Sequence, residues 1–182
     1  MKMNLPNKLT LARVIMVPFF VAALLYREGD STPARMLALG LFLVASFTDF
    51  LDGYIARKYQ LITNFGKFMD PLADKLLVCS ALICLIPLGE LPAWYVVILI
   101  GREFVISGFR LVAADHNIVI AASIFGKAKT ASQMIMIILL LLQIPALAFV
   151  NQIFIVLSLV LTILSLVDYV YKNHRVISEG GF

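Results

Sequence analysis

The chain has 182 residues, of which 62% are hydrophobic and only 14% are charged, and its mean hydropathy is +0.97. Soluble domains carry about 45–50% apolar and about 25% charged residues, so this composition excludes a disordered chain, a disulfide scaffold and an ordinary soluble enzyme. The net charge of +4 comes from Lys and Arg residues spread singly between apolar runs, which does not indicate nucleic-acid binding. The composition predicts one integral membrane domain over residues 1–182, with no room for a separate soluble domain.

Six apolar runs follow one another along the chain, and each is long enough to cross a bilayer as a helix. They cover residues 9–26, 35–56, 67–86, 92–114, 127–142 and 152–170. Only α-helices satisfy their own backbone hydrogen bonds as single segments in lipid. The pattern therefore predicts an all-α fold, an integral membrane bundle of six transmembrane helices.

The positive charges of the connecting segments lie mainly on one side of this predicted bundle. That side carries Lys2, Lys8, Arg57, Lys58, Lys127, Lys129, Lys172 and Arg175. The other side has only Arg27 and Arg35. Because loops rich in Lys and Arg stay in the cytoplasm, both termini are expected there. The first run has no clear cleavage site, and Thr10 and Arg13 interrupt it, so we expect a retained helix rather than a signal peptide.

Four aspartates lie inside the second and third predicted helices. Asp49 and Asp52 are three residues apart, and Asp70 and Asp74 are four apart, so each pair shares one helix face. Counted inward from the charged helix ends, the four lie about 4–12 Å deep. Because a connection of about nine residues makes the two helices antiparallel neighbours, all four carboxylates can meet in the cytoplasmic half of the membrane.

Carboxylates exposed to lipid would each cost about 2.5–3.5 kcal/mol on insertion scales. Carboxylate oxygens suit Mg²⁺ or Mn²⁺, and no Cys or His lies close to these aspartates in the sequence. The pattern therefore predicts a divalent metal site formed by the four aspartates. The alternative is that they form buried ion pairs with Arg57, Lys67 and Lys75.

Two residues beside the aspartates fit a phosphate-containing ligand. Gly53 removes a side chain next to Asp52, which lets a ligand approach the backbone, although tight helix packing also explains a glycine in a membrane helix. Arg57 offers a guanidinium fork that matches phosphate, and its alternative role is an anchor at the membrane interface.

The aspartates belong to a longer motif with eight fixed positions. It reads Asp49-x-x-Asp52-Gly53-x-x-Ala56-Arg57, then eight residues, then Gly66-x-x-x-Asp70-x-x-x-Asp74. This motif resembles the signature of the CDP-alcohol phosphotransferases, membrane enzymes that transfer a phosphatidyl or similar group from a CDP-linked donor to an alcohol and release CMP. The resemblance implies a six-helix fold with two Mg²⁺ or Mn²⁺ ions held by the four aspartates.

The resemblance also implies roles for individual residues. Asp74 is expected to act as the general base on the incoming hydroxyl as well as a metal ligand. The expected CDP site consists of Gly53, Ala56, Arg57, Asn7 and Thr10. Members of the family are often homodimers, so a homodimer is expected.

Three further stretches are similar to bacterial members of the family that use CDP-diacylglycerol as donor and sn-glycerol 3-phosphate as acceptor. They cover residues 4–13, 101–110 and 126–130. The predicted topology brings a basic group to the cytoplasmic side, where it suits an acceptor that carries a phosphate: Arg102, Arg110, Lys127 and Lys129. We therefore expect phosphatidylglycerophosphate synthesis at the cytoplasmic side of the bacterial inner membrane.

The basic residues also have simpler explanations. Arg102 could pair with Glu103 or Asp168, and Lys127 and Lys129 could be ordinary anchors of a cytoplasmic loop. A related transferase that uses phosphatidylglycerol, inositol phosphate or serine is the main functional alternative. A cation transporter is a more distant one, because its acids should be spread along the bilayer normal rather than gathered in one half.

Overall fold

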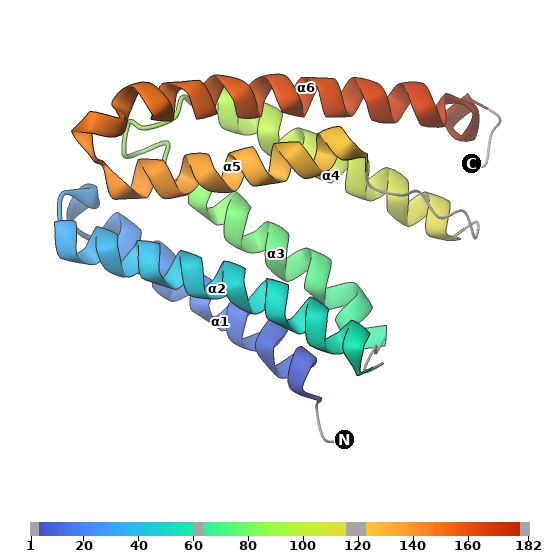
Figure 1. The fold of residues 1–182 in the computed structure, drawn as a ribbon, viewed down its shortest axis with the longest axis horizontal. Coiled ribbons are helices and arrows are strands. Elements are labelled where there is room, and N and C mark those ends of the chain that lie inside the picture. Colours follow the sequence, from blue (N-terminus) through green and yellow to red (C-terminus); the bar gives the residue numbers. More distant parts are fainter. Residues whose placement is uncertain (1–3, 60–63, 116–122, 179–182) are drawn as a thin grey trace. The chain divides into compact units, whose positions relative to one another are not determined.

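The computed structural model describes residues 4–59, 64–115 and 123–178. Its α-helices follow in the order α1 (Leu5–Leu25), α2 (Thr32–Lys58), α3 (Asn64–Cys84), α4 (Ala93–Asp115), α5 (Ile124–Leu142) and α6 (Ala148–Ser178) (Figure 1). Short 3₁₀ helices, Tyr26–Gly29 and Pro145–Leu147, follow α1 and precede α6. These described ranges contain no strand, which confirms the all-α prediction.

Two helices begin at side-chain caps rather than at the first apolar residue. The Oδ1 of Asn4 accepts a hydrogen bond from the backbone N–H of Asn7 at 3.1 Å, and the Oγ of Ser123 accepts one from Gly126 at 3.1 Å. Such caps satisfy N–H groups that lack a partner within the helix. As a result, α1 and α5 both start a few residues before the apolar runs at 9–26 and 127–142.

The first compact unit, Met1–Leu91, contains α1, α2 and α3, and α1 packs against both of the others. The buried residues of α1 recur every three or four positions and are Pro6, Asn7, Thr10, Arg13, Val17, Phe20 and Leu24. Toward the end of α1, Phe20 packs against Phe42 of α2 with ring centroids 5.9 Å apart. Toward its start the same face is polar, and there it meets the end of α2 that carries Asp49 and Asp52.

The opposite end of this unit is held by a partly buried ion pair. Arg35 at the start of α2 donates to Glu90, in the segment after α3, at 2.7 Å. Gly29 has a φ of +81°, and a Cβ there would lie 2.7 Å from the Leu88 side chain. A glycine is therefore required where the α1–α2 connection packs against the segment after α3.

The second compact unit, Pro92–Phe182, contains α4, α5 and α6, and α6 packs against both α4 and α5. Tyr95 of α4 is buried, and its hydroxyl lies 2.9 Å from the carbonyl oxygen of Ile155 and 2.5 Å from the Oγ of Ser158. A buried hydroxyl needs such partners, so these contacts fix α4 against α6. The division into two compact units does not test the prediction that residues 1–182 form one domain, which stays a prediction.

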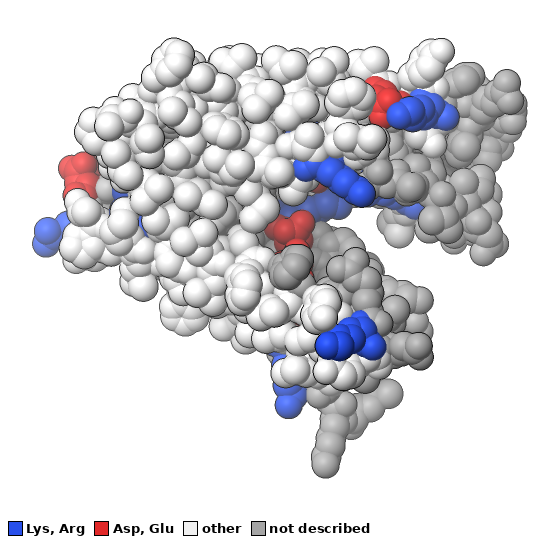
Figure 2. All heavy atoms as spheres, in the orientation of Figure 1, with Lys and Arg blue, Asp and Glu red and all other residues white. Residues whose placement is uncertain are grey.

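The surface and the helix lengths identify a membrane protein. Three segments among the described residues are long and apolar enough to span a bilayer: Leu5–Gly29, Ile124–Leu142 and Pro145–Asn173. On α6, exposed apolar side chains recur every three or four residues, as at Val156, Val160 and Ile163. Residues other than Lys, Arg, Asp and Glu make up most of the described surface that Figure 2 shows. The other three helices, α2, α3 and α4, are 21–27 residues long and contain most of the charged residues of the predicted site. That these three helices cross the membrane stays a prediction.

Candidate active site

Asp49 and Asp52, near the end of α2, bind one guanidinium from α1. Arg13 Nη1 donates to Asp49 Oδ1 at 2.7 Å, and Arg13 Nη2 donates to Asp52 Oδ2 at 2.5 Å. Because both carboxylates reach the same fork, they lie on one face of α2, as their three-residue spacing predicts. The Arg13 side chain is 0% exposed and the Asp52 side chain 2%, whereas the Asp49 side chain is 40% exposed.

Arg13 is the residue that the sequence interpretation missed. The ion pairs considered there involved Arg57, Lys67 and Lys75, whereas the structure supplies the cation from the first helix. The signal was present, because an arginine inside an apolar membrane helix requires an acidic or polar partner. Its position relative to Asn7 and Thr10, at successive three-residue steps, also places it on the buried face of α1.

The other two aspartates are on α3, which packs against α1 and α2. Asp74 is half-buried and lies next to Ala73, which is buried against the core of the first unit. The side chain of Asp70 lies outside the described residues. Among the side chains that are described, no three Asp, Glu, His or Cys groups are gathered closely enough to hold a metal ion, so the four-aspartate cluster stays a prediction.

The residues expected to bind CDP fall into two groups. Asn7 and Thr10 are buried on the same face of α1 as Arg13, and the Thr10 hydroxyl donates to the carbonyl oxygen of Pro6 at 3.2 Å. The side chains of Ala56 and Arg57, and the surroundings of Gly53, lie outside the described residues, although all three positions belong to α2. The structure thus places the α1 part of this expected site next to the Asp49–Asp52 pair.

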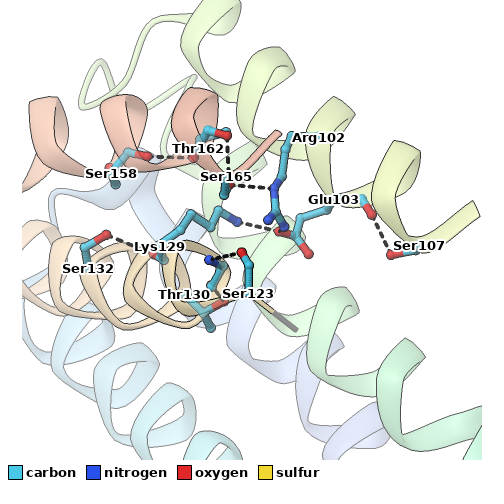
Figure 3. A network of polar contacts seen from close by, with 11 residues as sticks. Arg102, Glu103, Ser107, Ser123, Lys129, Thr130, Ser132, Ser158, Thr162 and Ser165 are labelled. Carbon is cyan, nitrogen blue, oxygen red and sulfur yellow. Dashed lines mark hydrogen bonds and ion pairs between the residues drawn. The ribbon is translucent and has the colours of Figure 1, made fainter. Parts of the chain in front are cut away.

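A second charged group lies inside the Pro92–Phe182 unit and centres on Glu103 of α4 (Figure 3). Its Oε1 accepts hydrogen bonds from Lys129 Nζ of α5 at 2.6 Å and from Arg102 Nη1 at 3.0 Å. Arg102 Nε also donates to Ser165 Oγ of α6 at 3.0 Å. These three charged side chains carry a net charge of +1 and join all three helices of the unit.

This network resolves two of the alternatives for the basic residues. Arg102 pairs with Glu103, as one of them proposed, while Asp168 pairs with Lys172 at 2.7 Å. The alternative that Lys129 is an ordinary loop anchor is wrong, because its side chain is 1% exposed and bound to Glu103. A single carboxylate between two cations lowers the cost of burying both of them.

Arg110 and Lys127 differ from Arg102 and Lys129 in being exposed. Phe109 packs on Tyr169 with ring centroids 6.3 Å apart, so the turn of α4 that carries Arg110 lies against α6. Lys127 is two residues before the buried Lys129, on the first turns of α5. The predicted basic group therefore consists of the buried Lys129 and the partly buried Arg102, which both bind Glu103, and of the exposed Arg110 and Lys127.

Comparison with known proteins shows similarity to phosphatidyltransferases. A family model described as CDP-alcohol phosphatidyltransferase matches residues 3–164. A Bacillus subtilis protein named CDP-diacylglycerol–glycerol-3-phosphate 3-phosphatidyltransferase is 50% identical over 149 residues, which are 77% of either chain. A Mycobacterium tuberculosis protein named probable phosphatidylglycerophosphate synthase is 42% identical over 173 residues, 94% of this chain and 82% of the relative. A Haemophilus influenzae protein with the same name as the Bacillus relative is 41% identical over 140 residues, 74% of either chain.

Proposed function

Because this chain belongs to the CDP-alcohol phosphatidyltransferase family, we propose that it transfers the phosphatidyl group of CDP-diacylglycerol to sn-glycerol 3-phosphate. The products are phosphatidylglycerophosphate and CMP. The observation that carries this proposal is the extended similarity to bacterial relatives whose names state this reaction or its product. The complete aspartate motif, which lies within the residues matched by the family model, supports it.

Enzymes of this family depend on metal ions, and we assign their binding to Asp49, Asp52, Asp70 and Asp74. The donor set fits a hard divalent cation, Mg²⁺ or Mn²⁺, because it consists of carboxylates on successive turns of two helices. Asp49 and Asp52 already share one positively charged partner, so this pair is oriented to bind a common cation. Two bound ions would neutralise the pyrophosphate and stabilise the charge on the departing CMP.

Asp74 is assigned the proton transfer. The acceptor hydroxyl oxygen forms a bond to the phosphorus of the phosphatidyl group, the bond from that phosphorus to the CMP oxygen breaks, and the hydroxyl proton passes to the Asp74 carboxylate. Asp74 lies one turn beyond Asp70 on α3 and is half-buried. This combination of a metal-site position with partial exposure suits a base that meets a small, water-soluble acceptor.

The CDP moiety of the donor is assigned to the facing ends of α1 and α2. The residues on α1 are Asn7 and Thr10, and those on α2 are Gly53, Ala56 and Arg57. Asn7 and Thr10 share the buried face of Arg13, which binds Asp49 and Asp52, so the α1 residues adjoin the metal-binding pair. A nucleotide held there places its pyrophosphate next to the aspartates.

The acceptor phosphate is assigned to Arg110, Lys127, Lys129 and Arg102. The exposed cations Arg110 and Lys127 are suited to direct phosphate contact. Lys129 and Arg102 are engaged with Glu103 and supply a buried positive field, since the three groups together carry a net charge of +1. An acceptor alcohol without a phosphate, such as serine, has less use for this arrangement.

The chain is a bacterial-type membrane protein, and we assign it to the inner membrane with both termini and the active site on the cytoplasmic side. The charge asymmetry of the predicted loops supports this orientation. A homodimer is the proposed assembly, by resemblance to the family.

The purified protein in proteoliposomes with CDP-diacylglycerol tests the proposed reaction. Glycerol 3-phosphate, phosphatidylglycerol, serine and inositol phosphate are supplied in turn with Mn²⁺, and CMP and the lipid product are identified by mass spectrometry. We expect fast CMP release only with glycerol 3-phosphate and none in EDTA. A faster reaction with another alcohol would reassign the acceptor, and cation flux without CMP release would replace the enzyme with a transporter.

A further inference from the structure

Arg13 occupies a position that the aspartate motif does not include. Its guanidinium is fully buried between α1 and α2 and contacts one oxygen of Asp49 and one of Asp52. A guanidinium stays protonated in proteins, so this positive charge is permanent. The cluster of Asp49, Asp52 and Arg13 therefore contains two carboxylates and one fixed cation, and these three side chains carry a net charge of −1.

The position of this charge matters because the carboxylates are so close together. Two neighbouring carboxylates repel each other, most of all where one of them is buried as Asp52 is, and a shared cation offsets that repulsion. A carboxylate has about four lone-pair positions on its two oxygens, so a hydrogen bond from Arg13 does not use up its capacity to bind a metal ion. Arg13 and a divalent cation can therefore bind the Asp49–Asp52 pair at the same time. Because both are positively charged, they repel each other.

We propose that Arg13 is the fixed counter-ion of the metal site. It stabilises the Asp49–Asp52 pair while no metal is bound, and it lowers the affinity of that pair for divalent cations. Arg13 also restricts the two side chains, but an aspartate has only two rotatable bonds, whereas a full charge acts directly on a doubly charged ion. The charge effect is therefore the larger one. This inference rests on the proposed metal site.

Arg13→Gln tests the proposal, because glutamine keeps hydrogen-bond donors and removes the charge. Thermal unfolding in detergent is followed in EDTA and in saturating Mn²⁺, and Mn²⁺ binding is measured from the electron paramagnetic resonance signal of the free ion. We expect Tm in EDTA to fall by about 5 °C or more, and Tm in Mn²⁺ to fall by less than half as much. The Kd for Mn²⁺ should decrease about threefold or more, because binding now relieves a larger repulsion.

Arg35→Gln is the matched control, since Arg35 is also buried and paired with a carboxylate in the same unit. Its effect on Tm should be equal with and without Mn²⁺. If Arg13→Gln also lowers Tm by the same amount in EDTA and in Mn²⁺, or if it weakens the affinity for Mn²⁺, the proposal is overturned. A wild-type protein whose Tm does not respond to Mn²⁺ instead overturns the metal site itself, and this inference with it.

A double variant keeps the proposal testable if Arg13→Gln does not fold. Arg13→Gln with Asp52→Asn removes one charge of each sign from the most buried part of the cluster. In EDTA this double variant should be more stable than Arg13→Gln, or be recovered where the single variant is not. A double variant that is no more stable than the single one, or that is equally unrecoverable, contradicts a counter-ion role.

Discussion

At the scale of single residues, buried cations mark the places where helices are fixed to one another. Arg13, Arg35 and Lys129 are each 5% exposed or less, and each binds a carboxylate on another segment. Breaking a buried pair by removing one partner costs about 3–5 kcal/mol, because the remaining charge stays buried. Each of these buried cations therefore needs a carboxylate partner close by. For Arg13 these partners are Asp49 and Asp52, two of the aspartates of the proposed metal site.

Replacing Asp74 with Asn should separate chemistry from binding. Asparagine keeps the size and an oxygen that can bind a metal ion, but it cannot accept the proton. We expect kcat to fall by about 10²-fold or more, with a smaller change in the KM for CDP-diacylglycerol. Steady-state kinetics with both substrates measure this split.

Asp168→Asn is the matched control, because Asp168 lies on α6 and pairs with the exposed Lys172. It should retain nearly full activity. A kcat for Asp74→Asn within tenfold of the wild-type value would remove Asp74 from the role of base.

Arg110 is expected to act on the acceptor alone. Its exposed guanidinium is assigned to the phosphate of glycerol 3-phosphate, so Arg110→Ala should raise the KM for this acceptor about tenfold or more. The KM for CDP-diacylglycerol should stay nearly unchanged. Lys172→Ala, which removes another exposed cation from the same unit, should change neither. An effect of Arg110→Ala on the donor alone would show that the acceptor pocket is misplaced.

At the scale of helices, Glu103 connects α4 to α5 through Lys129, and its neighbour Arg102 connects α4 to α6 through Ser165 (Figure 3). Lys129 and Ser165 are both buried, so the two contacts hold α4 against α5 and α6. The Tyr95–Ser158 contact joins α4 and α6 at another level.

Glu103→Gln should therefore destabilise the protein more than the loss of one hydrogen bond would. It removes the charge that neutralises Lys129, and we expect Tm to fall by about 5 °C or more in a thermal melt. Ser107→Ala is the control, because the Ser107 hydroxyl donates a hydrogen bond to the carbonyl oxygen of Glu103 within its own helix and carries no charge. If the two variants lose the same stability, the charge of Glu103 does not hold α4 to α5.

Hydropathy predicts where the helices lie better than it predicts where they begin. All six predicted runs overlap α-helices of the structure, but α1 and α5 start earlier, at Asn4 and Ser123 caps that carry no hydropathy signal. The three-residue spacing correctly places Asp49 and Asp52 on one face. Their partner Arg13 lies 36 and 39 residues away in the sequence, and local spacing contains no information about such a distant contact.

At the scale of the whole molecule, composition and the aspartate motif predict the membrane class and the family, because both are written in local sequence. The family model and the apolar helices confirm these two predictions. The basic residues were harder to interpret. Their number favours a phosphate ligand, but only the packing of the second unit shows that Lys129 is buried against Glu103 while Lys127 is exposed.

Phosphatidyl transfer at the aspartates is checked most directly by comparing the wild type with Asp70→Asn in proteoliposomes that contain CDP-diacylglycerol, glycerol 3-phosphate and Mn²⁺. Mass spectrometry measures phosphatidylglycerophosphate and CMP together, and circular dichroism verifies that both proteins are folded. We expect the wild type to form the two products in equal amounts and Asp70→Asn to retain less than about 1% of that rate, because loss of a metal ligand removes charge stabilisation worth several kcal/mol. Equal rates in the two proteins, or CMP formed without phosphatidylglycerophosphate, would contradict the proposed reaction at this site.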